Sequence, residues 1–241
     1  MDPSHLDELI ELEDSYWWHV AKRQLVTRLL AKHFPPPGIL VEGGVGSARN
    51  LVEFQELGYE VHGFDIMSES VEHAQERGLK HVRQHDLSQP WPLEPHSVRV
   101  AVLLDVLEHL ADPVQVLRHV ANVLEPQGGI IVTVPAYPWL YGNWDKSLGH
   151  FRRYTARTLK QHATEASLRV EWLSHWNSFS LPAAIAVRGY QKCSPRVDKP
   201  DFPRVSPLMN RMLLSMASCE RQWLGKAKAP FGLSLVGVLR K

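Results

Sequence analysis

The stretch GILVEGGVGSARNLVEFQELGYEVHGFD, residues 38–65, decides the fold. An apolar run at 38–44 ends in glycines, a segment of helical periodicity follows at 47–58, and a second apolar run at 59–65 ends at Asp65. A strand, a helix and a strand in this order predict a βαβ unit with parallel strands and a right-handed crossover. The glycine-rich turn lets a ligand approach the backbone at a helix N-terminus, where N–H groups are free.

The same alternation continues along the chain. We predict further strands over 80–86, 97–105 and 127–135, and helices over 68–78 and 113–124. These segments together predict one mainly parallel sheet with helices on both faces. Ligands of such sheets bind beyond the carboxyl ends of the strands, so we expect functional residues directly after each strand.

The two ends of the chain depart from this alternation. Residues 4–33 have helical periodicity with a break near Ser15, and the later elements are a helix at 155–167, a strand at 169–176, a helix near 181–192, a Pro-rich linker at 195–207, a helix at 207–224 and a strand at 234–241. We expect one face of the helix at 207–224 to be core or a homodimer surface. Its apolar residues are Leu208, Met209, Met212, Leu213, Met216 and Trp223.

Composition limits the class of protein. The chain of 241 residues has 27 Lys and Arg against 26 Asp and Glu, so no global charge recruits nucleic acid. Two cysteines fit a reducing compartment. The acidic start lacks the features of a signal peptide, and no apolar run reaches about 18 residues. We therefore expect a cytoplasmic protein without stable membrane insertion.

Two carboxylates follow successive predicted strands. Asp65 ends the second strand 19 residues after Gly46, where a carboxylate can accept hydrogen bonds from ribose hydroxyls, or where it can cap the next helix. Asp86 ends the third strand and precedes Leu87, which suits an acceptor for an adenine amino group beside an apolar wall, or an ordinary loop. Arg49 stands where a nicotinamide fingerprint requires its last glycine, which counts against a dinucleotide.

Five segments in succession carry a family resemblance. They are VEGGVGSARN (41–50), VHGFDIMSESVEHA (61–74), VRQHDL (82–87), LLDVLEHLADP (103–113) and VLEPQGGIIVTVPAYPWLY (123–141). In order and spacing they resemble the motifs of class I S-adenosylmethionine (SAM) dependent methyltransferases. DSYWWHVAKR (14–23), with PAYPWLY (135–141) and HFRRYT (150–155), resembles a bacterial, small-molecule subgroup of these enzymes.

The resemblance implies a fold and a domain organisation. We expect a Rossmann-like, seven-stranded, mainly parallel sheet within a single domain, 1–241. Its parts would be an N-terminal helical lid (1–34), a core (35–178), a helical insertion (179–230) and the last strand (231–241).

The resemblance also implies SAM as the cofactor. The loop at Glu42, Gly44 and Gly46 would hold SAM. Asp65 would hold its ribose and Asp86 with Leu87 its adenine. Its methionine part would lie near Asp105 and Val106. The residues that we assign to the cofactor are Glu42, Gly43, Gly44, Gly46, Asp65, Ile66, Asp86, Leu87, Asp105 and Val106.

The glycine loop departs from the family pattern at three positions. Glu42 stands where aspartate is usual, Ala48 where a third glycine is usual, and Val45 where a small residue or cysteine is usual. These departures motivate one alternative, a catalytically degenerate SAM-fold binding protein. A nucleotide-dependent oxidoreductase on a similar sheet is a second alternative.

The acceptor side is less determined. Methyl transfer needs alignment, an apolar cavity and in some cases a base, so our candidates for catalysis are His109, His150 and Asp145, although His109 could equally pack against the next helix. The loop 137–154 could line a pocket with an arginine fork for an anionic group, or form a structural cover. We assign no metal ligand and expect a small acceptor, methylated on oxygen. The residues assigned to it are Tyr16, Trp17, Trp18, Tyr137, Trp144, Arg152, Arg153 and Tyr154.

Overall fold

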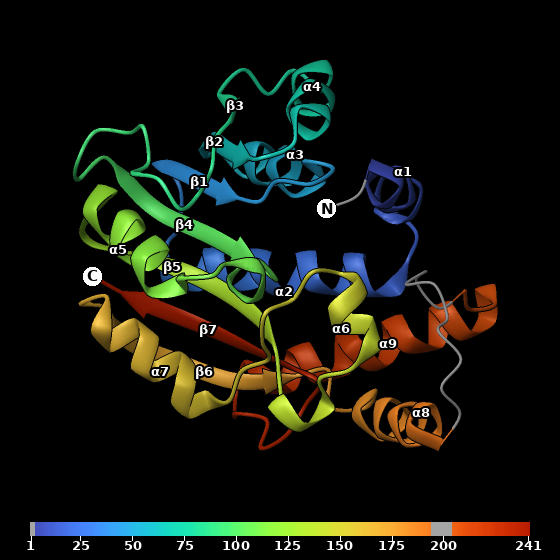
Figure 1. Cartoon of the computed structure of the whole chain (residues 1–241). Coiled ribbons are helices and arrows are strands. Elements are labelled where there is room, and N and C mark those ends of the chain that lie inside the picture. Colours follow the sequence, from blue (N-terminus) through green and yellow to red (C-terminus); the bar gives the residue numbers. More distant parts are fainter. Residues whose placement is uncertain (1–2, 194–203) are drawn as a thin grey trace.

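A seven-stranded sheet forms the centre of the computed structural model, which describes residues 3–193 and 204–241 (Figure 1). The strand order is β3-β2-β1-β4-β5-β7-β6. Strands β1 to β5 pair in parallel, and β7 is antiparallel to both of its neighbours. The expected mainly parallel sheet is confirmed. The strands are β1 (Ile39–Gly43), β2 (Glu60–Asp65), β3 (Val82–Gln84), β4 (Val98–Leu104), β5 (Leu124–Pro135), β6 (Arg169–Trp176) and β7 (Ser234–Arg240).

Helices cover both faces of the sheet. Because of this, successive residues of β4 are all buried: Val100 and Val102 face one core and Ala101 and Leu103 the other. One core includes residues of α2 (Trp17–His33), α3 (Arg49–Glu56), α4 (Ser68–Glu76) and α9 (Pro207–Leu224). The other includes residues of α5 (Pro113–Val123) and α7 (Ala156–Glu165).

Three further helices gather at the end of the sheet toward which β1 and β4 point (Figure 1). They are α1 (Pro3–Leu12), α6 (Asn143–Ser147) and α8 (Leu181–Cys193). Two short 3-10 turns lie at the same end, η1 (Leu107–His109) after β4 and η2 (Pro138–Leu140) after β5. The residues that follow the parallel strands are therefore covered by irregular chain and short helices.

The N-terminal segment splits near Ser15, as predicted. The backbone N–H groups of Ser15 and Tyr16 both donate to the carbonyl of Leu12, which ends α1 before α2 begins. Helix α2 is a core helix, since Val26 and Leu30 are fully buried in it. Only α1 and the start of α2 lie where a lid was expected.

The apolar face of α9 is exposed, so its assignment to the core is wrong. The helix contacts the core through Ala217 and Leu224 instead, and its buried Glu220 accepts hydrogen bonds from the backbone N–H groups of Asn177 and Ser178. A homodimer through the exposed face stays a prediction. The linker at 195–207 lies largely outside the described residues. The exposed residues are Leu208, Met209, Met212, Met216 and Trp223, while Leu213 is half-buried.

Candidate active site

The glycine loop after β1 needs its glycines for conformation and for space. Gly44 and Gly46 have φ angles of +75° and +52°, which residues with a Cβ rarely adopt. A Cβ at Gly44 would lie 2.8 Å from a methyl of Val106. Ala48 stands at the family's third glycine position and also has a positive φ, +59°. This strain explains physically why glycine is usual there.

Glu42 is a buried carboxylate at the base of this loop. Asn50 donates to its Oε1 at 2.9 Å, and Oε2 has no hydrogen-bond partner among the described residues. Burial raises the pKa of Glu42 to about 8. A ligand ammonium beside this oxygen would favour the ionised form of Glu42, in which Oε2 accepts a hydrogen bond.

Asp65 is buried at the end of β2 and faces the glycine loop. Its Oδ2 accepts from the backbone N–H of Gly46 at 3.0 Å, and its Oδ1 accepts from the N–H of Met67 at 3.0 Å. Each carboxylate oxygen keeps acceptor capacity for a further donor. The N-cap of α4 is Met67 rather than Asp65, and neighbouring Ile66 is exposed.

Asp86 and Leu87 lie on the next loop of the same edge. Asp86 is exposed, and its Oδ1 accepts from the N–H of Ser88 at 2.9 Å, which helps to lower the pKa of this carboxyl. Leu87 is buried and lies beside Gly43, in the same core cluster as Trp91. The loop thus has the expected carboxylate beside an apolar wall, and the contact with adenine stays a prediction.

Asp105 connects β4 to the N-terminal helix. It has a φ of +55° and accepts hydrogen bonds from Lys22 Nζ at 2.8 Å and from Thr133 Oγ1 at 3.1 Å. Burial opposes ionisation of Asp105, but the positive charge of Lys22 and these hydrogen bonds hold its pKa below the usual range. Lys22 was not predicted as a site residue, although it lies in the quoted segment 14–23.

The two candidate histidines meet at the end of β4. The rings of His109 and His150 lie edge to face with their centroids 4.6 Å apart. Glu108, which was not predicted, lies beside them, fully buried and without a hydrogen-bond partner for either carboxylate oxygen. These three residues could hold a metal ion, although we expected no metal ligand from the sequence. Burial lowers the pKa of His109 to about 4.

Asp145 is a fully buried hub rather than a free catalytic acid or base. It accepts from the N–H of Gly142 at 2.9 Å and from Arg153 Nε at 2.6 Å, and it lies 3.2 Å from His150 Nδ1. Burial opposes its ionisation, but the hydrogen bond from His150 and the charge of Arg153 lower its pKa. Asp145 therefore positions His150.

The predicted arginine fork is partly used within the protein. Besides Asp145, Arg153 contacts the carbonyl of Ala136, which fits a structural cover. Arg152 is half-buried and donates to the carbonyl of Ala111. Tyr154 is 1% exposed and lies in the core, so its placement in a pocket wall is wrong.

The remaining aromatic candidates pack in two groups. Trp18 stacks on Trp176 with ring centroids 4.7 Å apart, and Trp17 lies against Phe179 and Tyr16. The two adjacent tryptophans thus have different neighbours. The other group lies after β5: Tyr137 stacks on His175, and Trp144 of α6 is half-buried. Contact of these residues with an acceptor stays a prediction.

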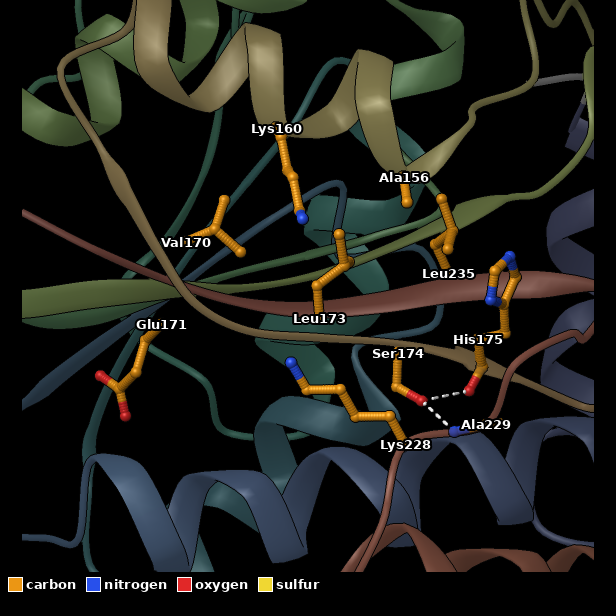
Figure 2. Close-up of a pocket in the computed structure, with 10 residues that line it drawn as sticks. All are labelled: Ala156, Lys160, Val170, Glu171, Leu173, Ser174, His175, Lys228, Ala229 and Leu235. Carbon is orange, nitrogen blue, oxygen red and sulfur yellow. Dashed lines mark hydrogen bonds between the residues drawn. The ribbon is translucent and has the colours of Figure 1, made fainter.

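A cavity of about 270 Å³ lies elsewhere, beside the edge strand β6 (Figure 2). It is bordered by α7 and by the chain around Ala229, and two lysines, Lys160 and Lys228, reach toward it (Figure 2). None of the residues that we assigned to cofactor or acceptor lines this cavity. We therefore place the site at the strand ends, where carboxylates and positive-φ residues converge.

The residues at the strand ends fit SAM. The unsatisfied Oε2 of Glu42 and the spare acceptor capacity of Asp65 match a ligand with ammonium and ribose hydroxyl donors. The glycine turn offers backbone next to them. Leu9 of α1 covers this turn, since a Cβ at Gly46 would lie 2.9 Å from its Cδ2.

Comparison with solved structures supports the fold. A SAM-dependent methyltransferase from Archaeoglobus fulgidus has a TM-score of 0.60 at 18% identity, over 91% of this chain and 94% of that one. Phosphoethanolamine N-methyltransferase 2 from Haemonchus contortus, solved with SAM, has a TM-score of 0.59 at 15% identity, over 90% and 52%. The [4+2]-cyclase SpnF has a TM-score of 0.63 at 16% identity, over 99% and 92%. The fold alone therefore leaves the reaction open.

Sequence comparison identifies the family of this chain. A probable S-adenosylmethionine-dependent methyltransferase from Mycolicibacterium smegmatis is 27% identical over 66% of this chain, and the match spans 62% of that relative's length. The model of the methyltransferase domain family matches residues 16–173. Within the described residues, no helix is both long and apolar enough to cross a membrane. The chain therefore belongs to the methyltransferase domain family, whose motifs in this sequence are those of the class I SAM-dependent methyltransferases.

Proposed function

We propose that this enzyme methylates an oxygen of a small molecule bound between η1 and the loop around α6. The observation that carries the proposal is the pair His109 and His150, in edge-to-face contact beside the SAM-side carboxylate Asp105. Two imidazoles beside the expected methionine end of the cofactor are typical of a site that handles a proton. We propose that it works in the cytoplasm, as expected from the sequence.

SAM supplies a methyl group on a sulfonium, and its transfer to a hydroxyl oxygen leaves a thioether and releases the proton of the hydroxyl. His109 is neutral near pH 7 because burial holds its pKa at about 4, so its imidazole can accept a hydrogen bond from the hydroxyl, whose proton is finally released to water. His150 is oriented by Asp145, which lies 3.2 Å from its Nδ1. We propose further that an anionic group of the acceptor binds Arg152. Arg153 is the other arginine of the predicted fork, but it is paired with Asp145.

The proposal is tested by incubating the purified protein and SAM carrying a labelled methyl group with a small-molecule extract, and separately with protein and nucleic acid fractions. We expect label in the small-molecule fraction, in a product whose methyl group mass spectrometry places on oxygen. Label in macromolecules, or on nitrogen or carbon, would overturn the proposal. Calorimetric binding of SAM without transfer to any fraction would favour the degenerate binding protein.

A further inference from the structure

We propose that Glu108, His109 and His150 bind one divalent transition-metal ion at the end of β4. One ligand atom from each residue lies within 4.8 Å of the other two. Two ligands on opposite sides of an ion are roughly 4.2 Å apart when each lies about 2.1 Å from it. Small side-chain rotations therefore bring all three atoms onto one ion.

The strongest sign of a missing partner is the carboxylate of Glu108. It is 0% exposed, and neither oxygen has a hydrogen-bond partner among the described residues. A buried carboxylate without a partner is costly, and most such groups in proteins are paired or bind metal. The two nearest cations are already engaged, Lys22 with Asp105 and Arg153 with Asp145. A bound cation would satisfy both oxygens.

The orientation of His150 also fits a metal ligand. Its Nδ1 lies 3.2 Å from the buried carboxylate of Asp145, which leaves Nε2 as the nitrogen with a free lone pair. Histidines that bind metal usually donate their other N–H to a carboxylate or carbonyl in this way. The backbone N–H of Phe151 donates to the carbonyl of Glu108 at 2.8 Å, so the loop that carries His150 is tied to η1.

The ligand set indicates the kind of ion. Two imidazoles and one carboxylate suit zinc, cobalt, nickel or iron, whereas magnesium prefers oxygen ligands alone. Three protein ligands leave further positions on the ion for water or for an oxygen of the acceptor. This last point rests on the proposed function, and an ion at this position would hold the acceptor oxygen beside the two imidazoles that bind it.

Cobalt(II) is a suitable probe, because its visible absorption reports binding directly. We expect the purified full chain, without SAM, to bind one Co²⁺ per chain. Glu108→Gln and His150→Gln should each weaken the binding by at least about tenfold. His62→Gln is the matched control, because His62 and His81 form another close imidazole pair, with ring centroids 4.7 Å apart, and it should leave the affinity unchanged.

The outcomes distinguish metal binding by Glu108 and His150 from a purely structural role of these residues. Without metal, Glu108→Gln should unfold at about the same urea concentration as wild type, because glutamine has nearly the same shape and the substitution removes no side-chain hydrogen bond within the described residues. Should Glu108→Gln fail to fold, His150→Gln decides in the same way. Unchanged Co²⁺ affinity in the folded variants, loss of binding in His62→Gln alone, or no binding by the wild type would overturn the proposal. Because SAM is absent, a failure of methyl transfer does not affect this result.

Discussion

The candidate site at the carboxyl ends of the parallel strands has two halves, which are built in different ways. In the cofactor half, around Glu42 and Asp65, the donors lie near in sequence and two of the three are backbone N–H groups. In the acceptor half, around Glu108 and His150, the partners lie about forty residues apart and meet through side chains of η1 and the loop around α6. The cofactor half is thus organised by local chain conformation and the acceptor half by tertiary contacts.

This difference predicts whether a substitution in each half affects ligand affinity or folding more strongly. Backbone donors remain when a side chain is replaced, so a substitution in the cofactor half should affect ligand affinity more than folding. In the acceptor half the buried carboxylate of Asp145 pairs with His150 and Arg153, so a substitution of Asp145 should affect folding first. The predictions below test this contrast.

The largest effect should come from Asp145→Ala. This variant removes a fully buried carboxylate and leaves Arg153 and His150 without their partner. Breaking a buried ion pair costs about 3–5 kcal/mol of the free energy of unfolding, which urea denaturation would measure. Asp14→Ala is the control, because the Asp14 carboxylate is exposed and should cost less than about 1 kcal/mol. Equal losses in the two variants would contradict the contrast.

Asp65→Ala should mainly reduce cofactor affinity. It removes a charged acceptor for the ribose hydroxyls, while the donors Gly46 and Met67 are backbone groups near the surface that water can satisfy. Hydrogen bonds to charged groups contribute about 1.5–3 kcal/mol, so we expect a roughly 10- to 150-fold weaker binding of SAM by calorimetry. The free energy of unfolding should change less than in Asp145→Ala. Unchanged SAM affinity would show that Asp65 does not contact the cofactor.

The same contrast explains how far the sequence could predict this protein. Strands β1, β4 and β5 were predicted because each contains a short apolar run, which is typical of a strand buried on both faces. Helix α6 was missed, since five residues are too few to show periodicity. The helix α9 was predicted from its apolar pattern, but an apolar stripe does not reveal whether another element covers it.

Residues at strand ends could be picked out from the sequence in both halves, but the contacts between distant side chains could not. Asp65 and Glu42 occupy strand ends, which the alternation of elements marks. Lys22 reaches Asp105 across 83 positions of sequence, and no local pattern indicates such a contact. Glu108 lies within the quoted segment 103–113, but only the structure shows that its carboxylate is buried without a partner.

Glu42→Gln should change how stability depends on pH. Burial raises the pKa of Glu42 from 4.5 to about 8, so the folded chain keeps this proton up to about pH 8 and the unfolded chain only to about 4.5. The contribution of Glu42 to stability is therefore present at pH 4.5 and is lost as the pH rises to 8, by up to about 1.4 kcal/mol per pH unit. In Glu42→Gln this loss should disappear. Parallel curves of unfolding free energy against pH for the two proteins would contradict the prediction.

The smallest effect should come from Asp86→Ala. Its carboxylate is exposed and accepts hydrogen bonding from Ser88 of its own loop. A hydrogen bond to the adenine amino group at such an exposed position competes with water, so we expect SAM affinity to fall by about 0.5–1.5 kcal/mol, less than for Asp65→Ala. Ser88→Ala keeps the carboxylate and is the control for loop conformation. An equally large loss of SAM affinity in Asp86→Ala and Asp65→Ala would contradict this prediction. It would indicate that the loop of Asp86 closes over the cofactor. The exposure of Asp86 in this structure would then underestimate its contribution to SAM affinity.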